Sequence, residues 1–167
     1  NLTSLQLPGP STVGYWTLAD PESGGIGATA TITINDASLI NSTTSSNGNH
    51  FTLVDTLGTV HAFTISTDHD LTINNIIGVQ TAQAESHEEN AAIQFAAAIN
   101  DATSTCADTI TAFANEPSTG IVTFIQDLEG EAGNNSENTQ YPYAQFGGWV
   151  LDYFTGGTGD IDPAGNS

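Results

Sequence analysis

The chain has 167 residues, a length that suits one domain, and it carries 19 aspartates and glutamates but no lysine or arginine. This charge argues against nucleic-acid binding, which draws most of its affinity from basic side chains, and against anionic membrane surfaces, which repel a net charge of −19. No apolar run approaches the roughly 20 residues of a membrane helix, so we expect a soluble protein whose carboxylates lie mostly at the surface.

Residues 1–26 are predicted to form an extended N-terminal arm. Prolines and glycines surround an isolated aromatic pair, Tyr15 and Trp16. Two interpretations stay open: the pair packs on the chain's own core, or it docks on a neighbouring subunit. The chain contains no methionine and begins with asparagine, which indicates a processed or trimmed start.

The first strands follow the arm. Residues 28–35 alternate threonine with alanine or isoleucine, the period-two pattern of a half-buried strand. After a polar loop at 41–50, residues 50–55 and 60–66 predict a hairpin with Asp55 and Gly58 at its turn.

A helix is predicted over residues 86–101. Ser86 and Glu89 have the spacing of a capping box, and Glu88 and Glu89 would lie in the first turn, where the helix dipole favours negative charge. An apolar stripe at helical spacing would pack against a sheet. Its members are Ala92, Phe95, Ala96 and Ile99.

Residues 109–114 and 120–126 predict a second hairpin, residues 147–154 a last strand, and residues 158–167 a flexible tail. The fold class is therefore α+β: a mostly antiparallel sheet of short strands in hairpin–helix–hairpin order, with one amphipathic helix packed on a face. The domain is expected to span residues 27–157. An all-β jelly roll is the alternative, but it has no obvious place for the helix.

The sequence contains none of the common motifs for catalysis, nucleotide binding or metal binding. The sequence has no Gly-x-Ser-x-Gly, no P-loop and no dinucleotide fingerprint, and its four histidines lack the spacing of a metal site. The single cysteine, Cys106, stands in a polar stretch without a neighbouring base. We therefore predict a protein that is not an enzyme, with no catalytic residues and no cofactor.

A weak structural calcium site is a second interpretation of one acidic stretch. Asp127, Glu129 and Glu131 supply hard oxygen ligands, but the stretch departs from an EF-hand loop at Ala132 and Asn138. The simpler interpretation is a solvated acidic loop.

Three segments, in this order, resemble a module of tailed-phage and prophage virion proteins. They are Asn90 to Asn100 (Asn-Ala-Ala-Ile-Gln-Phe-Ala-Ala-Ala-Ile-Asn), Gly130-Glu-Ala-Gly-Asn134, and Phe154-Thr-Gly-Gly157. The resemblance covers roughly residues 28–157. It implies a capsid-decoration, tail or fibre-associated structural protein on the virion surface or otherwise extracellular, whose partners are other virion subunits such as a major capsid or tail protein.

The sequence thus predicts an adhesive role, with Tyr15, Trp16, Trp149 and Tyr153 as contacts to a partner and carboxylates facing a basic lattice or bridging cations. Two alternatives remain: a secreted or cell-surface microbial adhesion module stabilised by calcium, and a filament subunit whose N-terminal arm completes a neighbour's sheet. Homo-oligomers are compatible with all three roles.

Overall fold

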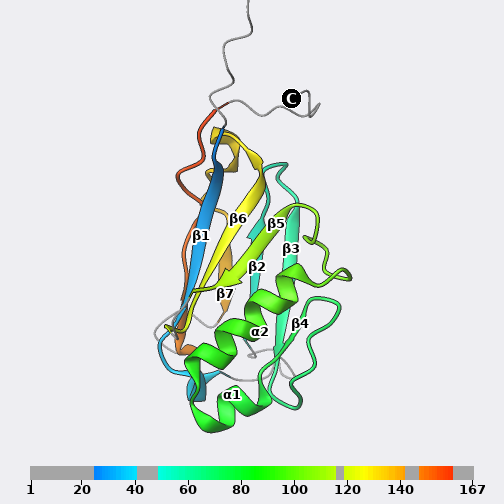
Figure 1. Cartoon of the computed structure of the whole chain (residues 1–167), viewed down its shortest axis with the longest axis vertical. Coiled ribbons are helices and arrows are strands. Elements are labelled where there is room, and N and C mark those ends of the chain that lie inside the picture. Colours follow the sequence, from blue (N-terminus) through cyan, green and yellow to red (C-terminus); the bar gives the residue numbers. More distant parts are fainter. Residues whose placement is uncertain (1–24, 41–48, 116–118, 142–146, 160–167) are drawn as a thin grey trace, which may run out of the picture.

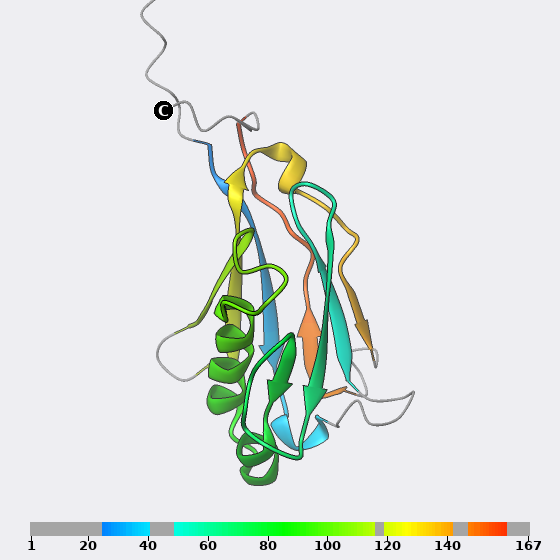
Figure 2. The same cartoon turned by 90° about the vertical axis from the view of Figure 1, so that its right-hand side faces the viewer.

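The computed structural model describes residues 25–40, 49–115, 119–141 and 147–159, which form two four-stranded sheets around one core (Figures 1 and 2). The first sheet has the strand order β5-β6-β1-β8 and the second has the order β4-β3-β2-β7. The strands are β1 (Gly27–Ile34), β2 (His50–Val54), β3 (Val60–Ser66), β4 (Ile76–Gly78), β5 (Ile110–Ala114), β6 (Ile121–Glu129), β7 (Thr139–Tyr141) and β8 (Trp149–Leu151).

The α+β class and the mostly antiparallel pairing are confirmed, as are both hairpins, β2-β3 and β5-β6. The strands are divided between two sheets instead of joining in one. The segment from β4 to β5 contains the helices and carries the chain from the second sheet to the first. Because that connection is long, the two hairpins need not pair, and each buries one face against the other sheet.

Two helices lie between the hairpins: α1 (Gln80–Glu85), which the sequence pattern did not predict, and α2 (Glu88–Asn100). The predicted apolar stripe of α2 is buried, and Glu88 and Glu89 occupy its first turn. The predicted capping box is wrong. Ser86 ends α1 as a left-handed C-cap, with φ 55°, and α2 begins after His87 without a side-chain cap. A residue that closes one helix in the left-handed region cannot also be the extended N-cap of the next.

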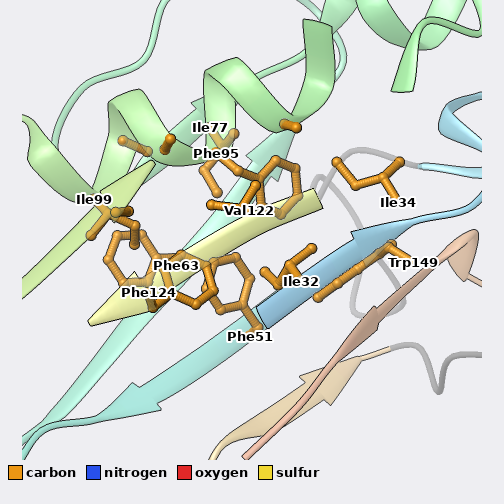
Figure 3. Packing of buried hydrophobic residues seen from close by; sticks show 14 of the residues in the cluster. Ile32, Ile34, Phe51, Phe63, Ile77, Phe95, Ile99, Val122, Phe124 and Trp149 are labelled. Atoms are coloured by element: carbon orange, nitrogen blue, oxygen red, sulfur yellow. The ribbon is translucent and has the colours of Figure 1, made fainter. Parts of the chain in front are cut away.

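The core gathers aromatic side chains from both sheets and from α2 (Figure 3). Phe51 of β2 stacks on Phe63 of β3 and on Phe95 of α2, with ring centroids 5.1 and 5.8 Å apart. Trp149 of β8 meets Phe51 and Phe95 edge-on, at 5.6 and 5.9 Å. One cluster of rings therefore joins four elements of the fold, β2, β3, β8 and α2.

Trp149 was predicted to contact a partner, and the structure corrects this. Its side chain is 0% exposed, because the antiparallel pairing of Trp149 with Ile34 places both residues on the inner face of the first sheet. Trp149 therefore belongs to the core.

The two ends of the described chain meet at one pole of the sandwich, where β1 begins and the chain after β8 ends (Figure 1). Ile26 N donates to Thr158 O and Thr158 N donates to Ile26 O, both at 3.0 Å. Ordered pairing therefore reaches beyond the expected 27–157 boundaries. Most of the expected arm, residues 1–24, and most of the expected tail, residues 160–167, lie outside the described residues.

Across the described part of the chain, neither helix is long and apolar enough to cross a membrane.

Candidate interaction surface

The pole where the chain ends meet is built from two of the segments that resemble the phage module. Asn134 of the first segment clamps Gly157 of the second: Asn134 Nδ2 donates to Gly157 O at 3.0 Å, and Gly157 N donates to Asn134 Oδ1 at 2.8 Å. Asn135 N also donates to Phe154 O at 3.1 Å. Segments separated by 20 residues in the sequence are thus fixed side by side.

Glycines allow this close approach. A Cβ on Gly27 would collide with the backbone oxygen of Gln126 on the neighbouring strand, and a Cβ on Gly157 would collide with the backbone oxygen of Gly130. Only glycine leaves room for backbones this close together. The glycines of the junction are therefore required by packing.

Buried carboxamides join the two sheets beneath the same pole. Gln126 of β6 donates from Nε2 to Val54 O in β2 at 3.2 Å and to Gly133 O at 3.1 Å, and its Oε1 accepts the hydroxyl of Thr56. Asn135 Nδ2 donates to Val54 O as well, at 2.9 Å. Both protons and the oxygen of the Gln126 amide are used, so the buried polar group is satisfied.

A second buried polar group lies at the β2-β3 turn. His61, which is 3% exposed, has its Nε2 3.0 Å from Asp55 Oδ2, while Asp55 Oδ1 accepts the amides of Leu57 and Thr59 at 2.9 and 2.8 Å. Burial by itself would raise the pKa of the Asp55 carboxyl, but hydrogen bonds from His61 and from these two amides lower it below its ordinary value. The carboxylate is thus stabilised in its charged form.

An Asp–His–hydroxyl chain is also found in nucleophilic enzymes, and Thr105 Oγ1 lies 3.2 Å from His61 Nδ1. Here the hydroxyl also accepts Asn75 Nδ2 at 2.7 Å. The chain of groups ties the β2-β3 turn to the loop before β5, which is a structural cross-link. Cys106, in the same loop, is fully buried, and burial raises the pKa of its thiol, so the thiolate is disfavoured.

Exposed carboxylates in a chain without lysine or arginine find donors in threonines. Thr31 donates to Asp152 at 2.6 Å, and Thr111 donates to Asp127 at 2.8 Å. Asp70 accepts both the hydroxyl and the amide of Thr81, at 2.6 and 2.8 Å, and these hydrogen bonds lower its pKa. In these pairs threonine donates the hydrogen bond that lysine or arginine commonly donates to a carboxylate in other proteins.

The outward side of the first sheet carries a surface that we call the threonine face. Along β1, β5 and β6, exposed and half-buried side chains alternate with buried ones, and the strand register aligns them in rows such as Phe113, Thr123 and Thr31. Its residues are Thr29, Thr31, Thr33, Thr111, Phe113, Ile121, Thr123, Ile125 and Val150. Phe113 is 46% exposed. None of these nine residues is charged, and the acidic residues that continue the same side of β6, Asp127 and Glu129, lie at the end of the strand.

The candidate calcium ligands are not brought together. In the described ranges no three histidine, cysteine, aspartate or glutamate side chains form a group that could hold a metal ion. Asp127 and Glu129 lie exposed on β6 with Asp127 bonded to Thr111, and Glu131 begins a short 3-10 helix, Glu131–Gly133.

Of the remaining predicted contacts, Tyr153 is 52% exposed, whereas Tyr15 and Trp16 lie outside the described residues. The sequence interpretation missed the carboxamide clamps and the threonine face. The face had a signal in the sequence, because the threonines of residues 28–35 all fall on one side of a strand. The clamps had none, since their partners are backbone atoms distant in sequence.

Comparison of the chain with protein-family models, with curated proteins and with solved structures gave no match.

Proposed function

We propose that the chain is a non-enzymatic structural module of a phage virion, of the capsid-decoration or tail- and fibre-associated kind, which attaches to a larger assembly and exposes an acidic surface. The observation that carries the proposal is the junction at one pole. Gly130–Asn134 and Phe154–Gly157, two of the segments that resemble virion modules, are bonded to each other where the first and last described residues meet.

The threonine face supports an adhesive role. It offers aliphatic and aromatic area and threonine methyl groups without a charge of its own, and carboxylates such as Asp127 and Asp152 lie beside it. A partner surface with an apolar centre and a rim of arginine or lysine would complement it. A second copy of the chain complements it poorly, because it brings the same charge.

Protein mass spectrometry of purified particles from the source organism tests the proposal. The digestion requires an Asp- or Glu-directed protease, because the chain gives trypsin no lysine or arginine to cut. Many copies per particle are expected. If the chain is missing from the particles and free in the medium, the virion role is wrong and a secreted adhesion role takes its place.

The contact face can be tested separately with the complete chain and purified particles that lack it. Phe113→Asp places a charge at the exposed edge of the threonine face and should reduce rebinding at least tenfold, whereas Tyr153→Ser, also exposed, serves as the matched control. Equal loss in both variants, or none in Phe113→Asp, would assign attachment to another surface.

A further inference from the structure

Strand β5 forms one edge of the first sheet and is unusually suited to pairing with another strand. Its sequence, Ile-Thr-Ala-Phe-Ala, has no charge and no proline, and Phe113 in it is 46% exposed. Uncharged apolar edge strands are templates for association between chains, and proteins protect them. The fold must therefore prevent this edge from pairing with a strand of another chain.

The protection comes from the last residue of α2. Asn100 Oδ1 accepts the amide of Ala112 at 2.9 Å, and Asn100 Nδ2 donates to the carbonyl of Ala112 at 2.6 Å. An antiparallel neighbour would take the amide and the carbonyl of one residue in the same way. The carboxamide thus occupies the position of an incoming strand.

The outer strands β8 and β4 are each covered by neighbouring segments of the chain. On β8, Gln140 of β7 donates to Trp149 O at 2.6 Å and accepts Leu151 N at 2.9 Å, while Asn138 Nδ2 reaches Asp152 O at 3.0 Å. The β4 edge is folded over by its preceding loop, where Thr72 Oγ1 accepts Gly78 N. At β5, helix α2 packs against the strand, and Asn100 is the side chain that bonds the outward backbone groups of Ala112 in its middle.

We propose that Asn100 is a strand stop, which keeps the β5 edge from pairing with the β5 edge of a second copy of this chain. Two such edges would bring together uncharged strands, so no local charge opposes them. Only the net charge of −19 on each copy does, and salt screens that repulsion. Asn100 therefore provides the protection that survives at high ionic strength. This inference does not depend on the proposed virion role.

The test compares the full-length wild type with Asn100→Ala in about 1 M NaCl, where the screening length is only ~3 Å. Size-exclusion chromatography with light scattering should give the monomer mass for the wild type and a dimer or larger species for N100A, growing with concentration. Asn134→Ala is the matched control, because Asn134 also makes two hydrogen bonds to the backbone of one residue, Gly157, but away from β5.

Two outcomes would overturn the proposal: N100A with the mass of the wild type, or N134A associating as strongly as N100A. Circular dichroism establishes that each variant is folded. If N100A is unfolded, Asn100→Ser, a milder loss of the same clamp, replaces it, and the same masses decide.

Discussion

The centre of the sandwich is held by aromatic packing, whereas the pole where the chain ends meet is held by carboxamides bonded to backbone. At the centre, Phe51, Phe95 and Trp149 exclude water over a large apolar area. At the pole, Gln126 and Asn134 fix glycine-rich segments that have few side chains to pack. Stability at the centre depends on how well the rings fill the space between the sheets. Stability at the pole depends on the distances and angles between hydrogen-bond donors and acceptors.

This difference follows from the charge inventory. With no lysine or arginine, the only side chains with a basic nitrogen that contact carboxylates in the described residues are histidines, His61 beside Asp55 and His87 beside Glu85. Loops that other proteins tie down with basic side chains must here be tied down by neutral donors. Asparagine and glutamine suit this role, because one side chain can both donate and accept.

The largest expected effect lies at the centre. Trp149→Ala should reduce the free energy of unfolding by about 3–5 kcal/mol, because it removes a fully buried ring from contact with Phe51 and Phe95. Urea denaturation measures the loss, with the exposed Tyr153→Ala as control. A stable W149A that no longer binds its assembly would restore the sequence-based assignment of Trp149 as a partner contact.

Asp55→Asn should cost about 1–3 kcal/mol at neutral pH, since it removes the buried carboxylate to which His61 and two backbone amides are hydrogen-bonded. Because the pKa of Asp55 is lowered from its ordinary value of 3.8, its contribution is complete above that value and is lost as the pH falls through the lower folded-state pKa. The difference between wild type and D55N in urea denaturation should therefore shrink below about pH 4. A difference that stays constant down to pH 2 would contradict this; Asp127→Asn is the exposed control.

At the pole, Gly27→Ala should cost about 1–3 kcal/mol, because the added methyl group collides with the backbone oxygen of Gln126 and forces β1 and β6 apart. Thr29→Ala on the outward side of the same strand is the control and should change stability by less than about 1 kcal/mol. Thermal unfolding compares them. Equal melting temperatures for G27A and wild type would show that the junction is loosely packed.

The smallest expected change in stability distinguishes between two structural roles of Ser86. Ser86→Gly should raise stability by about 0.5–1 kcal/mol, because Ser86 has a φ of 55° as the left-handed C-cap of α1. Had Ser86 been the N-cap of α2, as its spacing to Glu89 predicted, Ser86→Ala would cost about 1 kcal/mol. Chemical denaturation of the Gly and Ala variants distinguishes the two roles, and a loss in both would favour the capping box.

The spacing of apolar residues, together with the turn-forming residues between segments, was enough to predict β1, both hairpins and the buried stripe of α2. These elements depend on local alternation of polar and apolar residues, which survives in any tertiary context. The short helix α1 was missed because its six residues carry no apolar periodicity, and its position is fixed by distant contacts such as Thr81 to Asp70. Trp149 was misassigned because an aromatic in a glycine-rich stretch has the same sequence signature whether it faces the core or a partner.

By itself, the sequence determined the α+β class and the acidic character, and it predicts that nucleic acid and anionic surfaces are disfavoured as partners. Net charge is a sum over residues, and periodicity depends only on residues near one another in the sequence. Both can therefore be obtained without coordinates. Only the tertiary structure decided that the strands divide into two sheets, that Trp149 points inward, and that Asn100 and Asn134 clamp backbone more than ten residues away. The reason is that a carboxamide hydrogen-bonds any backbone group that folding brings within reach, and its own position in the sequence carries no record of which one.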